Sequence, residues 1–240
     1  MLIKPEAIIF DIDNTLYPYA PAHEAAMNAV YIKANKVLGI SKTVFQKAFK
    51  KSRDKVKYQL GQTASSHNRL IYFQQTIEYL GMKTQILFAL DLEQTYWRVF
   101  LTNCILFPGV KNFMHLIKSA GIITLNITDL TAQIQFKKLI YLKLDNYFDY
   151  VVTSEEAGAD KPDKRPFQIA IKKSGINPAN VWMIGDNSIA DIGGANNFGM
   201  TTIQKVHSGV KVNSHGPCKP FYTFNNYDHL NTKLSSLISI

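Results

Sequence analysis

Apolar and polar residues follow two different patterns along this chain of 240 residues. Between residues 18 and 105, apolar positions recur every three or four residues, which is the spacing of an amphipathic helix. Four helices are predicted in this part of the chain, at 21–39, 41–60, 68–80 and 84–103. No strand pattern interrupts them, so we expect this segment to fold as a helical bundle.

After Phe107-Pro108-Gly109, short apolar runs alternate with helical segments. Strands are predicted at 7–10, 122–127, 149–153, 181–185 and 200–204. Helices are predicted at 110–120, 131–143, 164–174, 188–198 and 228–238, with irregular structure at 205–226. This alternation predicts a parallel sheet with helices on both faces. We expect an α/β fold with two domains, a Rossmann-like core of residues 1–17 and 106–240 and an inserted helical domain of residues 18–105.

The composition is that of a globular protein, with 46% hydrophobic and 19% charged residues. No apolar stretch reaches the length of about 18 residues that a membrane span needs. The first apolar run, 7–10, is too short for a signal peptide. Two cysteines far apart in sequence, Cys104 and Cys218, do not indicate a disulfide framework. We therefore expect a cytoplasmic protein without a membrane partner.

The formal net charge of +9 lies mostly in one block of the chain. Residues 18–107 hold 12 Lys and Arg against 5 Asp and Glu, a net charge of +7. This excess could face a phosphorylated substrate, or it could be a solvated basic surface, and both interpretations stay open. The basic helix predicted at 42–57, with Phe45, Phe49 and Tyr58 interleaved, could also contact nucleic acid. We favour the simpler interpretation, in which the aromatic rings pack inside the helical domain and the lysines lie in water.

Two carboxylates stand just after the first predicted strand. The run 7–10 leads into Asp11 and Asp13, which lie two residues apart in the following loop. In open parallel sheets, ligands bind beyond the carboxyl ends of the strands. Carboxylates this close repel each other unless a cation or a shared proton intervenes, and the loop itself holds no Lys or Arg. This arrangement favours a bound metal ion.

The pattern Asp11-x-Asp13-x-Thr15 resembles motif I of the haloacid dehalogenase (HAD) superfamily. Phosphatases of that superfamily use the first Asp as nucleophile and the second as general acid/base. A second resemblance, to motif II, lies at the end of the strand at 122–127, where Thr128-Asp129 would hold the phosphoryl group. A hydroxyl and a backbone N–H suit phosphoryl oxygens because they donate hydrogen bonds without a titrating charge. Thr124 is the competing candidate, but it lies inside the strand, so we favour Thr128.

Two further segments complete the resemblance. Residues 154–162 resemble motif III, with Lys161 as the cation that offsets the repulsion between the nucleophile and a dianionic phosphate. Residues 185–191 match the Gly-Asp-x-x-x-x-Asp form of motif IV. By resemblance, Asp186 binds Mg²⁺ together with Asp11 and the backbone carbonyl of Asp13, and Asp191 supports the ion. The alternative for Asp191 is a helix cap or a salt bridge.

The joint match implies a HAD-type phosphoric monoester hydrolase whose helical insertion is a C1-type cap. We expect a Mg²⁺-dependent phosphatase that hydrolyses a small phosphorylated metabolite through an aspartyl phosphate. The segment 11–18 resembles the start of a branch that includes pyrimidine 5′-nucleotidases, while the rest is similar to small-metabolite phosphatases in general. Together these resemblances suggest a nucleoside monophosphate or a sugar phosphate. Candidates to line the entrance are Tyr17, Tyr19, Arg69 and Tyr72. We expect a monomer or homodimer without a nucleic-acid partner.

Three alternatives stay in view. A phosphomutase shares the same core motifs and differs in how it excludes water from the intermediate. A carbon–halogen hydrolase also uses an Asp nucleophile, but it needs neither Mg²⁺ nor a second carboxylate, so Asp13 speaks against it. A protein that binds nucleic acid or another anion through the basic helix is the alternative from outside the enzymes.

Overall fold

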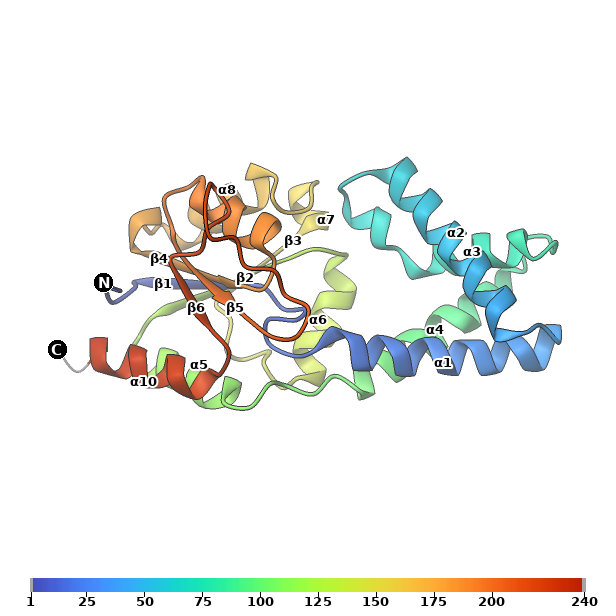
Figure 1. Cartoon of the computed structure of the whole chain (residues 1–240), viewed down its shortest axis with the longest axis horizontal. Helices are drawn as coiled ribbons and strands as arrows, with labels where there is room; N and C mark the ends of the chain where they lie inside the picture. The colour runs from blue at the N-terminus through green and yellow to red at the C-terminus, as the bar shows by residue number, and fades with distance from the viewer. Residues whose placement is uncertain (1, 239–240) are drawn as a thin grey trace. The chain divides into compact units, whose positions relative to one another are not determined.

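The computed structural model describes residues 2–238, which divide into two compact units (Figure 1). The first unit, which we call the α/β unit, combines Met1–Pro18 with Ile105–Ile240. The second, the helical unit, is Tyr19–Cys104. Each unit has its own buried core, and each is described separately.

The α/β unit is built on a sheet of six parallel strands in the order β3-β2-β1-β4-β5-β6. Neighbouring strands pair in register, so that Ala7 of β1 lies opposite Ile123 of β2 on one side and Val181 of β4 on the other. The strands are β1 (Ala7–Phe10), β2 (Ile123–Thr128), β3 (Tyr150–Thr153), β4 (Val181–Gly185), β5 (Thr201–Lys205) and β6 (Tyr222–Phe224). The expected α/β class with a Rossmann-like parallel sheet is confirmed.

Helices cover both faces of this sheet, as Figure 1 shows. The α-helices of the unit are α5 (Val110–Ser119), α6 (Ala132–Tyr141), α7 (Ser154–Ala157), α8 (Lys164–Ser174), α9 (Gly194–Asn196) and α10 (Tyr227–Ile238). On one face, Ile9 shares a buried cluster with Phe167 of α8. On the other, Phe10 packs edge-on against Phe113 of α5, which in turn contacts Tyr227 of α10. A strand buried on both faces must be apolar throughout, which explains the run at 7–10.

Two predicted elements of this unit are wrong. Residues 205–226 were expected to be irregular, yet Tyr222–Phe224 forms the edge strand β6. A helix was expected at 188–198, but the chain first forms a π-helical turn, Ser188–Gly193, and then the short α9. A π turn holds an extra residue per turn and re-aims the side chains that follow a strand.

The helical unit is formed by four long helices and one short 3₁₀ turn. They are α1 (Tyr19–Leu38), α2 (Lys42–Leu60), η1 (Ala64–His67), α3 (Arg69–Tyr79) and α4 (Ile86–Thr102). The side chains of α1 that face inward are small and four residues apart: Ala22, Ala26, Val30 and Ala34. This stripe lets α4 pack closely along α1. Val37 of α1 and Val44 of α2 are apolar but exposed.

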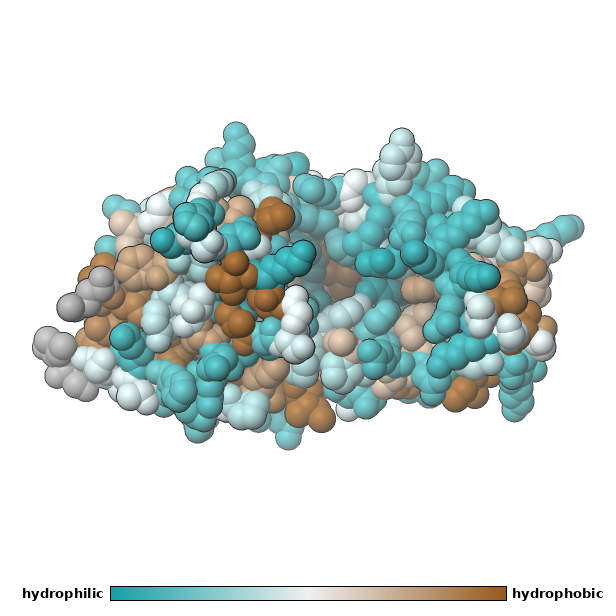
Figure 2. Space-filling view, in the orientation of Figure 1, coloured by the Kyte–Doolittle hydropathy of each residue, from teal (hydrophilic) through white to brown (hydrophobic). Residues whose placement is uncertain are grey.

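The basic side chains of α2 lie on its outer face. Figure 2 shows hydrophilic side chains gathered over this helix. Phe45 and Phe49 are buried, whereas Tyr58 is 90% exposed. The ammonium of Lys51 lies over the ring of Tyr79, 4.2 Å from its centre. Among residues 2–238, no helix combines the length and the apolar character that crossing a membrane requires.

Candidate active site

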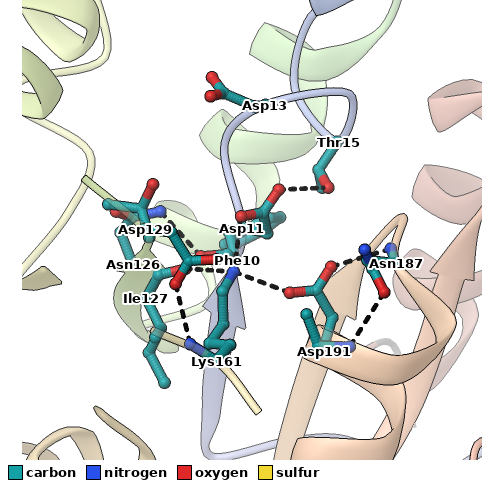
Figure 3. Close-up of polar contacts among 12 residues, drawn as sticks. Phe10, Asp11, Asp13, Thr15, Asn126, Ile127, Asp129, Lys161, Asn187 and Asp191 are labelled. Carbon is teal, nitrogen blue, oxygen red and sulfur yellow. Dashed lines mark hydrogen bonds and ion pairs between the residues drawn. The ribbon is translucent and has the colours of Figure 1, made fainter. Parts of the chain in front are cut away.

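The predicted site residues gather at the carboxyl ends of three adjacent strands (Figure 3). Asp11 directly follows β1, Thr128 is the last residue of β2, and Asp186 directly follows β4. Since β1 lies between β2 and β4, the loop at Asp11 meets two loops that lie more than 100 residues further along the chain. The parallel order of the strands thus explains why the motifs converge.

Asp11 is 7% exposed and is held from two sides. Its Oδ1 accepts a hydrogen bond from the Lys161 ammonium at 2.6 Å, and its Oδ2 accepts one from the Thr15 hydroxyl at 3.0 Å. The same ammonium donates to Asp191 Oδ1 at 2.7 Å and to the Ile127 carbonyl at 3.0 Å. The Lys161 ammonium therefore bridges the carboxylates of Asp11 and Asp191 and fixes their orientation relative to each other.

Three carboxylates of the site form a cluster. One oxygen from each of Asp11, Asp186 and Asp191 can be chosen so that all three lie within 4.8 Å of one another. Within residues 2–238, no hydrogen bond or ion pair is made by the carboxylate of Asp186. An all-oxygen donor set with one carboxylate left open fits a hard divalent cation such as Mg²⁺.

The electrostatics of the cluster reflect its excess of negative charge. Burial raises the pKa of Asp11 to about 7, and the repulsion of Asp191 adds to this while Lys161 opposes it. Burial, followed by the repulsion of Asp11 and Asp191, raises the pKa of Asp186 to about 8. Although burial by itself would lower the pKa of Lys161, the attraction of Asp11 and Asp191 holds it well above its usual value. The ammonium is therefore charged at neutral pH.

Asp13 lies apart from this cluster, as Figure 3 shows. Both of its carboxylate oxygens accept a hydrogen bond from the ammonium of Lys138 at 2.7 Å, and Oδ1 also accepts one from the Tyr17 hydroxyl. Lys138 comes from α6 and is 1% exposed. The loop after β1 lacks a cation of its own, as the sequence indicated, but Lys161 and Lys138 bring one to each of its two carboxylates.

Lys138 was not among the site residues predicted from the sequence, and one signal could have found it. Helical spacing places Lys138 on the same face of α6 as Ile134 and Gln135, both of which are buried. A lysine on the apolar face of a helix needs a partner, because an unpaired buried charge is unstable. Its neighbour Lys137 is exposed, in keeping with the more common place of a lysine.

Thr128 and Asp129 connect the loops around the site. Thr128 is 2% exposed, and its hydroxyl accepts a hydrogen bond from the Gln135 amide at 2.7 Å. The Asp129 carboxylate accepts one from the backbone N–H of Lys161 at 2.9 Å and one from the Ser154 hydroxyl at 3.1 Å. Thr124, the competing candidate, contacts Asp149 and the Tyr147 carbonyl instead.

Asp191 takes part in the cluster and also fixes the loop after β4. Its Oδ1 accepts the hydrogen bond from Lys161, and its Oδ2 accepts one from the backbone N–H of Asn187 at 3.0 Å. It also lies against Gly185, where a Cβ atom would come within 2.4 Å of the Asp191 carboxyl group. Gly185 is thus required by the close approach of this side chain.

Of the four residues expected at the entrance, Tyr17 lies in the α/β unit, where its hydroxyl donates a hydrogen bond to Asp13. The other three, Tyr19, Arg69 and Tyr72, lie in the helical unit. There, Arg69 donates to the Tyr19 hydroxyl at 2.8 Å and to the His67 carbonyl at 2.7 Å. Its guanidinium also lies 5.3 Å from the centre of the Tyr72 ring. These three residues form one polar cluster inside the helical unit.

Comparison with known proteins identifies the family. The family model of haloacid dehalogenase-like hydrolases matches residues 5–199, which is most of the chain and includes all four motif segments. The chain belongs to this family. The expected HAD membership, and with it a hydrolase built on a HAD-like core, is therefore confirmed.

Two curated relatives share about a third of their residues with this chain. Ribulose-1,5-bisphosphate 5-phosphatase of Halopiger xanaduensis is 34% identical over 198 residues, covering 82% of this chain and 83% of the relative. Glyceraldehyde 3-phosphate phosphatase of Methanothermobacter thermautotrophicus is 33% identical over 202 residues, covering 82% and 84%. Both relatives are phosphatases, which supports the expected phosphoric monoester hydrolase.

A solved structure shows the same fold at lower identity. The magnesium-bound HAD hydrolase YfnB of Bacillus subtilis superposes with a TM-score of 0.75 at 19% identity. The match covers 97% of this chain and 99% of that one. At this identity the likeness concerns the fold alone.

Proposed function

We propose that this protein is a Mg²⁺-dependent phosphatase that hydrolyses a small phosphorylated metabolite through an aspartyl phosphate. The observation that carries the proposal is the setting of Asp11, a carboxylate at the end of β1 held between the Lys161 ammonium and the Thr15 hydroxyl. A nucleophilic carboxylate needs this kind of fixed orientation and a nearby positive charge to meet a dianionic phosphate. The phosphatase relatives support the same reaction.

The metal would be held by Asp11, Asp186 and the backbone carbonyl of Asp13, with Asp191 in support. The support for this set is the cluster of Asp11, Asp186 and Asp191 and the open carboxylate of Asp186. When bound, a divalent cation supplies charge neutralisation and alignment of the phosphate oxygens. The roles of nucleophile, acid/base and phosphate binding belong to residues of the chain.

In the proposed first step, Asp11 attacks phosphorus and an O–P bond forms as the bond to the leaving oxygen breaks. Asp13, in its protonated form, gives its proton to that oxygen. Thr128 and the Lys161 ammonium hydrogen-bond the phosphoryl oxygens, where negative charge accumulates. The metabolite alcohol departs and the phosphoryl group stays on Asp11.

In the proposed second step, Asp13 takes a proton from a water molecule as that water attacks phosphorus. The O–P bond to Asp11 breaks, inorganic phosphate leaves, and Asp11 and Asp13 return to their starting forms. Asp13 thus acts first as acid and then as base, which requires a carboxyl group of its own, separate from the nucleophile. This need for a second carboxylate distinguishes the reaction from carbon–halogen hydrolysis.

The substrate we propose is a sugar phosphate or a related small phosphate ester. Both curated relatives act on phosphorylated sugars of three or five carbons, which favours this class over nucleoside monophosphates. We further propose that the helical unit is the C1-type cap and that it selects the metabolite. Asp11 and Asp13, in the loop after the Ala7–Phe10 strand, would then act on any ester that the cap admits.

The test is hydrolysis of para-nitrophenyl phosphate by the wild type and by Asp11→Asn, with Mg²⁺ and with excess chelator. We expect Asp11→Asn to lose activity by at least about a thousandfold, and chelator to abolish wild-type turnover. Trapping of radiolabelled phosphate on the wild-type protein, but not on Asp11→Asn, reports the aspartyl phosphate. Wild-type activity in the folded variant would overturn the proposal.

A second experiment identifies the metabolite. The wild type is offered ribulose 1,5-bisphosphate, glyceraldehyde 3-phosphate, phosphoglycolate and nucleoside monophosphates, and free phosphate and organic products are both measured. We expect release of phosphate from the sugar phosphates with the highest kcat/KM. An isomeric phosphate ester in place of free phosphate would instead identify a phosphomutase.

A further inference from the structure

Helix α6 directs two buried polar side chains at the loops of the site. Gln135 and Lys138 are three residues apart, which places them on the same face of the helix. Gln135 donates to the Thr128 hydroxyl, and Lys138 donates to both oxygens of Asp13. One helix thus contacts both a substrate-binding residue and the acid/base of the proposed mechanism.

The ion pair between Lys138 and Asp13 is unequal in exposure. The Lys138 side chain is 1% exposed, whereas that of Asp13 is 33% exposed. Removing a lysine from water is costly, and buried ion pairs are poor contributors to stability. The cost falls on the lysine, while the carboxylate keeps the access to solvent and substrate that an acid/base needs. Stability alone does not account for such a pair.

The two lysines of the site contact different carboxylates. Lys161 contacts Asp11 and Asp191, on the side of the carboxylate cluster. Lys138 contacts Asp13 instead, at 2.7 Å to each oxygen. An ammonium in contact with both oxygens fixes the rotation of the carboxyl group, which the single contact from Tyr17 would leave less constrained.

We propose that Lys138 is a positioning residue for the general acid/base. This proposal rests on the proposed phosphatase function. Lys138 holds the Asp13 carboxyl group in the orientation for proton transfer, and its fixed charge stabilises the carboxylate that Asp13 becomes when the proton passes to the leaving oxygen. In the first step, this contribution is needed only where the leaving oxygen needs that proton, whereas in the second step, where Asp13 takes a proton from water, it is the same for every ester.

Leaving-group dependence tests this directly. An alkyl leaving group, as in glycerol phosphate, must be protonated as it departs, whereas dinitrophenolate is stable without a proton. We expect Lys138→Met to lower kcat/KM, which covers the steps up to departure of the leaving group, by about 100-fold for glycerol phosphate and by less than about tenfold for dinitrophenyl phosphate. Slower hydrolysis of the aspartyl phosphate, a step common to both esters, lowers kcat for both and leaves this contrast in kcat/KM unchanged.

The chain offers a matched control at the adjacent position. Lys137 is exposed, so Lys137→Met removes the same charge from the same helix without touching Asp13. We expect wild-type kinetics for it with both substrates, within about twofold. Lys138→Arg, which keeps the charge, and Lys138→Ala supplied with ethylammonium are expected to recover part of the turnover of glycerol phosphate. A loss caused only by altered packing would not respond to the added amine.

The outcomes separate this proposal from the proposed function. If the wild type hydrolyses neither ester, the phosphatase function fails. If the wild type is active and Lys138→Met loses the same factor in kcat/KM with both esters, the positioning role is overturned and Lys138 is structural. Circular dichroism and thermal unfolding check the fold, and Lys138→Gln repeats the comparison with a neutral hydrogen-bonding side chain if Lys138→Met does not fold.

Discussion

At the scale of single residues, the site holds more carboxylate charge than its ammonium balances. Asp11, Asp186 and Asp191 carry three negative charges when ionised, and among the described residues only Lys161 forms an ion pair with this cluster. The raised pKa values of Asp11 and Asp186, about 7 and about 8, are the direct result of burial and mutual repulsion. A divalent cation would remove the repulsion, and the proton uptake with it.

This charge excess predicts how folding stability depends on pH. In chelator, Asp11 and Asp186 keep protons in the folded state that the unfolded chain releases near the usual carboxyl pKa of 3.8. The stability from these two groups is therefore full below about pH 3.8, falls as pH rises from there, and is lost once pH passes about 7 and 8. We expect the midpoint of thermal unfolding to fall by about 4 °C or more over this range. Added Mg²⁺ should reverse the fall, most strongly at alkaline pH.

Asp186→Asn is the control for that measurement, because it removes one raised carboxyl group and one proposed ligand. Its unfolding midpoint in chelator should fall less steeply with pH than that of the wild type, and Mg²⁺ should shift it less. Asp11 and Asp186 repel each other, so the difference between the two curves reports this pair, while the titrating groups outside the cluster contribute equally to both proteins. Parallel curves would contradict the charge argument.

The close approach of the Asp191 side chain to Gly185 leads to a prediction. In Gly185→Ala, the new methyl group would meet the Asp191 carboxyl group at 2.4 Å, so Asp191 must shift from the position in which it accepts the hydrogen bond from Lys161. We expect a loss of about 1–3 kcal/mol in the free energy of unfolding and at least about a tenfold loss in kcat. Gly194→Ala, which meets the Phe167 ring at 2.5 Å, should lose similar stability with a smaller effect on kcat. Equal kcat values for the two variants would count against the role of Asp191.

The residues that sequence alone could place share one property, which is their position directly after a strand. Asp11 and Asp186 follow apolar runs, and the parallel sheet brings such ends together whatever their separation in the chain. Lys138 and Gln135 lie within a helix, in a stretch whose lysines look alike. Which lysine turns inward depends on the packing of α6, and a local pattern does not carry that information.

At the scale of elements, strong periodicity was sufficient for the long helices and buried strands. The segments 164–174 and 181–185 match α8 and β4 at both ends. The weak elements were those whose structure depends on partners. β6 has only three residues and exists because it pairs with β5, while the π turn after β4 contains Asp191, which is held by Lys161. Tertiary contacts determine the secondary structure of such segments, so the sequence pattern alone does not predict it.

The stripe of small residues on α1 supplies the prediction at this scale. Ala26 is fully buried where α1 packs along α4, so Ala26→Leu adds three carbon atoms to a closely packed contact. We expect the free energy of unfolding, measured with urea, to fall by about 1–3 kcal/mol. Ala20→Leu makes the same change at an exposed position of the same helix and should be nearly neutral. A neutral Ala26→Leu would mean that this contact is loosely packed.

At the scale of the whole molecule, the chain joins two compact units of different charge. The helical unit, Tyr19–Cys104, holds 12 Lys and Arg against 5 Asp and Glu, and the whole chain carries +9. A net positive protein attracts a dianionic ester over distances comparable to the screening length, which is about 10 Å at moderate salt. The basic surface would then serve catalysis through the rate of substrate encounter, and the sequence left this open against a merely solvated surface.

Salt and charge variants together decide between these two interpretations. If the surface attracts substrate, kcat/KM for a dianionic phosphate ester should fall by about threefold to tenfold as ionic strength rises from low to above physiological, with kcat unchanged. Replacing the exposed Lys47, Lys50 and Arg53 of α2 by Gln should flatten that dependence without changing kcat. A variant with the wild-type dependence would assign these side chains to solvation alone. If the wild type binds unrelated duplex DNA at low salt and the variant does not, these three side chains would instead be assigned to nucleic-acid binding. Contacts to DNA phosphates depend on Lys and Arg charges and not on the base sequence.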